Sequence, residues 1–129
     1  MQNKAFGLLG IANKGGNVQI GEDPVGQVCK SGKARLLILA SDAADHTVRR
    51  MNSFASLHDT PVVQLDEDKS ALGAVFGRNS VAMVAITEIS LAEGFLKALG
   101  QEERYRQQID AVHQKAVYMK QRKGKKGKR

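Results

Sequence analysis

The chain has 129 residues, of which 42% are hydrophobic, enough for one domain with a buried core and too few for two large domains. No apolar run approaches the roughly 20 residues that cross a bilayer, and the first residues carry no secretion signal, so we expect a cytoplasmic protein with no membrane partner. Cys29 is the single cysteine, which excludes an intramolecular disulfide and a multi-cysteine zinc site and favours a small core residue.

The net charge of +7 comes from the end of the chain. Residues 120–129 contain seven of the 20 basic residues and no acid, so residues 1–119 carry 13 basic and 13 acidic residues and are formally neutral. A segment of this composition cannot pack a core, and we predict a disordered basic tail that neutralises nucleic-acid phosphates in a salt-dependent way. A solubilising end without a fixed partner is the alternative.

In chain order, the first predicted element is a helix over residues 4–12, with an apolar face made by Phe6, Leu8, Leu9 and Ile11. Residues 17–20 alternate polar and apolar side chains, which is typical of a half-covered strand. A second helix follows, because Asp23 can cap a helix and Pro24 suits its first position. Gly32 then ends that helix.

Three further strands are predicted from short apolar runs. Residues 35–40 and 81–86 are apolar almost throughout, as central strands buried on both faces are. Residues 61–65 form another strand, because a proline is accepted at the first position of a strand.

Helices separate these strands. Ser41 or Asp42 can cap a helix whose apolar residues point toward the sheet, namely Val48, Met51, Phe54, Ala55 and Leu57. Residues 68–77 form a short helix that ends on glycine, and residues 89–99 form another before Gly100. The alternation of helices and strands predicts an α/β fold, a three-layer α/β/α sandwich around a small, four-stranded mixed sheet.

Gly100 marks a predicted boundary, which divides the chain into a domain (1–100), an amphipathic helical extension (101–119) and the basic tail (120–129). The helix predicted over residues 101–122 carries an apolar stripe formed by Tyr105, Ile109, Val112, Ala116 and Met119. Three interpretations are open for it: a terminal helix packed on its own domain, a helix that binds a partner, or one that orders when the tail meets RNA.

The sequence lacks the residue constellations that most enzymes use, and we expect no catalytic activity, cofactor or metal. The three histidines, His46, His58 and His113, fall on polar helical positions that favour solvent exposure. The glycine-rich residues 13–17 lie between a helix and a strand, whereas a phosphate loop runs from a strand to a helix. Asp66, Glu67 and Asp68 are consecutive, and a solvated helix cap is favoured over a cation site.

Four segments, in order and with similar spacing, resemble the ribosomal L7Ae/L30e family, in particular its bacterial L7Ae-like members. They are Gly21 to Ala43, with the sequence GEDPVGQVCKSGKARLLILASDA, then Thr60 to Val63, Ala71 to Gly77 and Arg78 to Thr87. The resemblance covers about residues 5–99. It implies an L30e-like sandwich that binds RNA, often kink-turns, through residues 21–31 and the loop 77–81.

The resemblance and the tail together predict the RNA-binding residues. Kink-turn binders of the family carry Asn-Glu, and then Lys three residues after the Glu, where this chain has Asp23, Pro24 and Gln27. Ionised Asp23 accepts hydrogen bonds but cannot donate as asparagine does, Pro24 has no polar side chain, and Gln27 keeps hydrogen bonding but lacks the positive charge of lysine. The predicted RNA-binding set is Lys14, Gly21, Glu22, Asp23, Gln27, Lys30, Ser31, Arg78, Asn79, Ser80, Val81, Lys120, Arg122, Lys123, Lys125, Lys126, Lys128 and Arg129.

Two hypotheses for function follow. The first is an RNA-binding protein, associated with the ribosome or bound to a structured, kink-turn-like RNA, and acting as a monomer. The second is a protein-interaction module that has lost specific RNA readout and binds a partner through the helix after Gly100. Co-sedimentation with ribosomes at low and high salt distinguishes the two hypotheses. Binding to RNA weakens steeply as the salt concentration rises, whereas binding through an apolar interface weakens far less.

Overall fold

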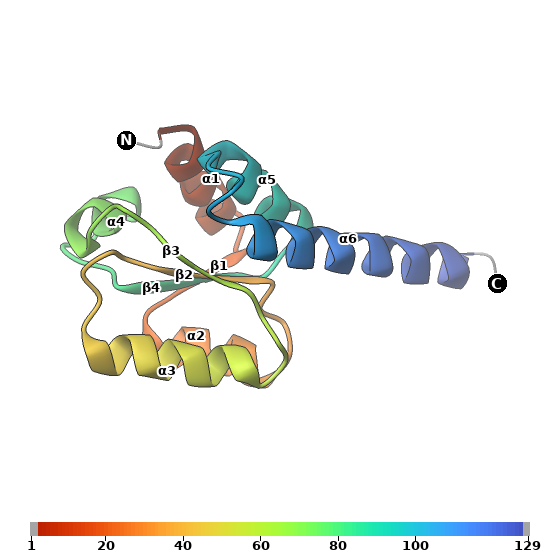
Figure 1. Ribbon diagram of the computed structural model, residues 1–129, viewed down its shortest axis with the longest axis horizontal. Coiled ribbons are helices and arrows are strands. Elements are labelled where there is room, and N and C mark those ends of the chain that lie inside the picture. The colour runs from red at the N-terminus through yellow and green to blue at the C-terminus, as the bar shows by residue number, and fades with distance from the viewer. Residues whose placement is uncertain (1–2, 128–129) are drawn as a thin grey trace.

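The computed structural model describes residues 3–127, and its elements form two helical layers around one sheet (Figure 1). Helices α2 and α3 cover one face, and helices α1, α4 and α5 lie on the other together with the first part of α6. The elements are α1 (Asn3–Lys14), β1 (Val18–Ile20), α2 (Glu22–Lys30), β2 (Leu36–Leu39), α3 (Asp45–Ser56), β3 (Val62–Gln64), α4 (Lys69–Val75), β4 (Met83–Ile86), α5 (Ile89–Leu99) and α6 (Arg106–Gly127). Among residues 3–127, none of these helices is both long and apolar enough to cross a membrane.

The sheet confirms the predicted mixed, four-stranded arrangement. Its strand order is β1-β4-β2-β3, with β4 antiparallel to both β1 and β2, and with β3 parallel to β2. All residues of β2 and β4 are buried. This agrees with their continuous apolar runs, because a central strand covered by helices on both sides has no solvent-facing position.

Alternate residues of each central strand contribute to two separate cores. Leu36 and Ile38 pack with α1, α4 and α5, whereas Leu37 and Leu39 pack with α2 and α3. Cys29 belongs to the second core and is 1% exposed, as predicted, and its burial raises the pKa of the thiol.

Two predicted helix starts are wrong. Helix α2 begins at Glu22 after Gly21, whose φ of 93° suits glycine, so Asp23 lies inside the first turn and does not cap the helix. Helix α3 begins at Asp45 after Ala44 and not after Ser41 or Asp42, and the Asp42 carboxylate instead accepts a hydrogen bond from the Lys69 N–H at 2.8 Å. A capping residue type therefore occurs near both starts, and at α3 the Asp42 side chain satisfies a backbone N–H of α4 instead.

Two apolar residues assigned to the core are also exposed. Ile11 is 68% exposed, because α1 turns Phe6, Leu9 and Ala12 toward the core and Ile11 lies on another side of the helix. Leu57 is 51% exposed, because it follows the last residue of α3.

The caps of α4 and α5 lie in the turns that lead from β3 and β4. The Asp68 carboxylate accepts from the Ala71 N–H at 2.8 Å, which confirms a capping role in the acidic turn 66–68. Glu88 caps α5 by accepting from the N–H groups of Ser90 and Leu91. Partial burial acts to raise the pKa of Glu88, but hydrogen bonds from the Ser90 hydroxyl and from the Leu91 and Ser90 N–H groups outweigh it and lower the pKa.

Replacing Glu88 with Ala should lower the free energy of unfolding by about 1 kcal/mol at neutral pH, since the cap satisfies two N–H groups of α5. The pKa is lower in the folded state, so the ionised cap stabilises the fold above its unfolded pKa and this contribution is lost as pH falls through the folded pKa. Urea melts at several pH values measure both effects. A parent–variant difference that persists undiminished in acid would contradict the cap.

Helix α6 covers the outer edge of the sheet. Strand β3 is an edge strand, and its outward carbonyls accept from this segment: Gln64 O from the Tyr105 hydroxyl at 2.9 Å and Val62 O from Gln108 Nε2 at 2.9 Å. Tyr105 and Val112 join the main core. The interpretation as a terminal helix packed on its own domain is therefore confirmed for this first part of the apolar stripe.

The end of α6 differs from the prediction. A turn over residues 101–105 precedes the helix, which begins at Arg106 and continues to Gly127, through most of the segment predicted to be disordered. Lysine, arginine and glutamine favour the helical state, and a helix already nucleated by packing adds residues easily. The division at residues 100 and 119 stays a prediction.

Candidate nucleic-acid interface

Two of the predicted RNA-binding segments meet at one end of the sheet. Strand β1 runs antiparallel to β4, so the end of β1 at Ile20 pairs with Val84 near the start of β4. The Gly21 N–H donates to Met83 O at 3.1 Å, which joins the start of α2 to the end of the loop before β4. Figure 1 shows this end of the sheet on the side where α4 lies. We call it the α2 end.

The first part of this end is a shallow groove between α2 and α3. It is lined by Glu22, Asp23, Gly26, Gln27, Lys30, Arg50 and Phe54. A Cβ at position 26 would lie 2.8 Å from the Phe54 ring, so glycine allows the two helices to approach closely here. Glu22, Asp23, Gln27 and Lys30 are all exposed, and their contact with RNA stays a prediction.

Arg50 is a residue of this groove that sequence reasoning missed. Its Nε lies 3.3 Å from the Glu22 carboxylate, and both side chains are about half exposed. The pair reduces the negative charge that Glu22 presents at the start of α2, although a surface ion pair contributes at most about 1 kcal/mol to stability. The polar face of α3 was its only signal in the sequence.

The second part of the α2 end is the loop between α4 and β4. The Arg78 N–H donates to Gly73 O at 2.9 Å, and a Cβ at position 73 would lie 2.7 Å from the Arg78 carbonyl oxygen, so the loop folds tightly back on α4. Arg78, Asn79 and Ser80 are exposed and available to a ligand. Val81 is only 4% exposed and packs in the core, so its prediction as an RNA contact is wrong for the side chain.

Two other predicted residues lie elsewhere. Lys14 lines a separate depression between α1 and α4. Ser31 follows the last residue of α2, where its hydroxyl donates to Val28 O at 3.3 Å. Lys30 is on the groove side of α2 but eight residues after Glu22, or about 12 Å along the helix axis.

The basic tail leaves the molecule far from the α2 end. The Tyr105 hydroxyl, just before α6, donates to Gln64 O, and Gln108 near the start of α6 donates to Val62 O. Residues further along α6 line a pocket together with Pro61, which precedes β3, so α6 runs antiparallel to β3. Figure 1 shows it projecting past the end of the sheet opposite to α4. Lys120 and Arg122 are exposed on this projection. The other predicted tail contacts, Lys123, Lys125, Lys126, Lys128 and Arg129, lie outside the side chains that the structure describes.

Comparisons with known proteins agree on one family. The sequence profile described as "Ribosomal protein L7Ae/L30e/S12e/Gadd45 family" matches residues 3–94. The RNA-binding protein YlxQ of Bacillus subtilis is 29% identical over 94 residues, which cover 73% of this chain and 93% of YlxQ.

Two solved structures share the fold. A protein of unknown function from Bacillus halodurans is 22% identical, with a TM-score of 0.69 over 76% of this chain and 98% of that one. The 15.5kD RNA binding protein of Giardia lamblia is 19% identical, with a TM-score of 0.62 over 78% of this chain and 86% of that one.

Proposed function

Because the chain belongs to the ribosomal protein L7Ae/L30e/S12e/Gadd45 family, we propose that it binds structured RNA through the α2 end. The observation that carries this proposal is the hydrogen bond from Gly21 to Met83, which joins the start of α2 to the start of β4, at the end where the loop of Arg78, Asn79 and Ser80 enters that strand. The names of two relatives, the B. subtilis RNA-binding protein and the G. lamblia 15.5kD RNA binding protein, support RNA as the ligand.

The chemistry of this end suits an irregular RNA region. The first turn of α2 presents unpaired N–H groups and the positive end of the helix dipole, which favour a phosphate. Arg78, in the loop that leads into β4, adds an exposed positive charge, and Asn79 and Gln27 can donate to and accept from exposed base edges. Phosphate contacts then orient the RNA, and the amides read bases that are not in Watson–Crick pairs.

The proposal extends to a monomer that associates with the ribosome in the cytoplasm and has no catalytic activity. All three histidines are exposed, and the hydrogen bond between His113 Nδ1 and the Glu93 carboxylate, at 2.8 Å, joins α6 to α5. Tyr105, Ile109 and Val112 of the apolar stripe pack within the molecule, so this part of the stripe is not free to bind a protein partner. Co-sedimentation with ribosomes at low and high salt tests the association, since phosphate contacts weaken with salt.

The turn at the start of α2 can be tested by restoring the residues of kink-turn binders. The variant Asp23→Asn, Pro24→Glu and Gln27→Lys raises the charge by one, and it should bind a kink-turn hairpin far more tightly while its affinity for a plain duplex changes little. Each bidentate base contact contributes about 1–3 kcal/mol of discrimination, whereas one surface charge acts on both RNAs alike. Fluorescence anisotropy with the two RNAs measures the difference.

The matched control is Asn52→Lys, which adds the same charge at an exposed position of α3. Circular-dichroism melts check that the loss of Pro24 from the first turn of α2 leaves the fold intact. Equal gains on both RNAs, matching those of the control, would show that the turn is not placed for reading bases.

A further inference from the structure

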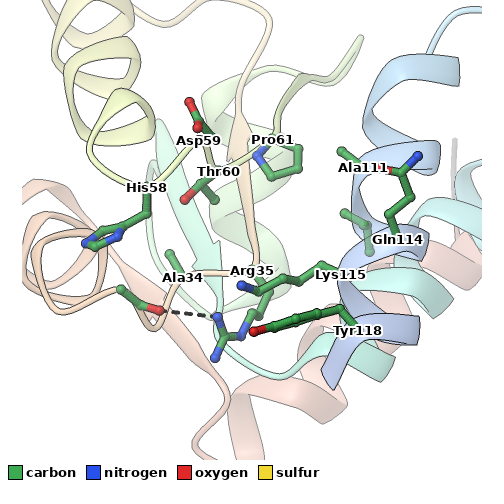
Figure 2. Close-up of a pocket in the computed structure, with 12 residues that line it drawn as sticks. Ala34, Arg35, His58, Asp59, Thr60, Pro61, Ala111, Gln114, Lys115 and Tyr118 are labelled. Carbon is green, nitrogen blue, oxygen red and sulfur yellow. Dashed lines mark hydrogen bonds between the residues drawn. The ribbon is translucent and has the colours of Figure 1, made fainter. Parts of the chain in front are cut away.

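A second surface with the features of a ligand site lies at the end of the sheet opposite to the α2 end. It is a pocket of about 450 Å³, within the roughly 300–1,000 Å³ typical of ligand sites. Three segments far apart in sequence build it: the turn between α2 and β2, the turn between α3 and β3, and the middle of α6. We call it the Arg35 pocket; Figure 2 shows Arg35, Lys115 and Tyr118 pointing into it.

Arg35 has hydrogen-bond donors that the described protein does not use. Its Nη1 donates to Gly32 O at 3.2 Å, and its Nε is buried without a hydrogen-bond partner among the described residues. A guanidinium carries five N–H donors, so the side chain can still bind an anion. Lys115 brings a second positive charge from α6, and Figure 2 shows the carboxylate of Asp59, the acid of this pocket, pointing away from Arg35.

Tyr118 adds an aromatic ring to these two cations. The side chain is 50% exposed, with Lys115 Nζ 5.6 Å and Arg122 Cζ 5.9 Å from the ring centre. Arg122 Nη1 also donates to the Tyr118 hydroxyl at 3.3 Å, and this bond, together with the charges of Arg122 and Lys115, lowers the pKa of the phenol. An exposed ring with cations beside it is the arrangement that proteins use to stack bases of single strands.

The charges of the two ends differ in sign. The α2 end carries seven acidic residues, Glu22, Asp23, Asp42, Asp45, Asp66, Glu67 and Asp68, and four basic ones, Arg50, Lys69, Arg78 and Arg104. The opposite end carries the basic residues Lys33, Arg35, Lys115, Lys120 and Arg122 and the acid Asp59. A flexible polyanion is therefore drawn to the end that holds the Arg35 pocket.

We propose that the Arg35 pocket binds single-stranded RNA, with a phosphate held by Arg35 and Lys115 and a base stacked on Tyr118. This inference rests on the proposed function in taking RNA as the ligand, and it adds a second contact site. Beyond Tyr118, α6 continues for nine residues, about 14 Å, and carries Lys120 and Arg122. This basic extension favours a polynucleotide over a free phosphate as the ligand of the pocket. A strand that leaves the pocket can follow this helix.

The test uses the full chain and a fluorescent oligouridine of about twelve nucleotides, which has no base pairs and suits the usual length of single-strand sites. Tyr118→Ala should weaken its binding roughly 5- to 100-fold, the loss of one stacked base, and Tyr118→Phe should restore it. Arg35→Gln should weaken it severalfold more than the matched control Arg49→Gln, which removes a charge at an exposed position of α3. If Arg35→Gln unfolds at lower temperature, Lys115→Gln takes its place, because Lys115 is exposed.

A kink-turn hairpin without overhangs separates this inference from the proposed function. The hairpin should bind Tyr118→Ala as it binds the parent, because its site is the α2 end. If the hairpin does not bind the parent but oligouridine binding depends on Tyr118, the result contradicts structured-RNA binding at the α2 end and supports single-strand binding in the Arg35 pocket. If Tyr118→Ala binds oligouridine within about twofold of the parent, the proposed pocket is overturned. It is also overturned if Arg49→Gln weakens oligouridine binding as much as Arg35→Gln does. Displacement of oligouridine by inorganic phosphate, with no effect of Tyr118→Ala, also overturns it in favour of a plain anion site.

Discussion

Truncation after Met119 should weaken binding to every RNA, without regard to sequence, by about a hundredfold or more at low salt. The deletion removes seven basic residues and no acid. Each lost phosphate contact lowers the slope of log affinity against log salt by about 0.7 on single strands and about 0.9 on duplex, so the slope should fall by up to about 5 or 6. Anisotropy titrations over a salt series measure the slope directly.

A shorter truncation separates the tail from the Arg35 pocket. Ending the chain after Arg122 keeps Arg35, Lys115, Tyr118 and the bond from Arg122 to Tyr118, and removes five basic residues. This variant should show most of the reduction in salt slope expected for the truncation after Met119. Its affinity for single-stranded RNA should still be weakened by Tyr118→Ala. A slope unchanged by either truncation would mean that the tail does not contact RNA.

Replacing Leu37 with Ala should lower the free energy of unfolding by about 2–5 kcal/mol. Leu37 is 0% exposed in β2, where it lies between Val62 of β3 and Ala85 of β4 and packs in the core under α2 and α3. The loss combines the transfer of the removed atoms with the cavity left in a core that is closed on both sides. For a domain of this size the melting temperature should fall by roughly 10 °C.

Leu57→Ala is the matched control, because the same substitution is made at a leucine that is 51% exposed. Its effect should stay within about 0.5 kcal/mol. Similar melting temperatures for the two variants in a thermal melt followed by circular dichroism would contradict the placement of Leu37 in the centre of the sheet.

The sequence by itself determined the central strands, the last helix of the domain and the class of fold. The runs that became β2 and β4 are apolar almost throughout, and α5 spans residues 89–99 as predicted, ending before Gly100. These features depend on local composition, because a strand buried on both faces or a helix with a clear end keeps the same pattern wherever it packs. The similarity to a family added the expected RNA-binding segments.

Helix starts were less certain, because several residues near each start can cap a helix. Ser41, Asp42 and Asp23 are all good capping types, yet α2 follows Gly21 and α3 follows Ala44. The first residue of each helix depends on the turn that the chain makes after the preceding strand. It also depends on distant partners, such as the Lys69 N–H that donates to Asp42. Neither appears in the local sequence.

Only the tertiary structure decided which predicted RNA-binding residues lie together. The sequence placed the start of α2 and the basic tail in one set, but α6 runs antiparallel to β3 and carries the tail to the opposite end. Arg35 meets Lys115 and Tyr118, which lie about 80 positions later in the chain, in one pocket. Strand direction and strand order determine which loops share an end of a sheet, and both result from long-range pairing that no local pattern of residues encodes.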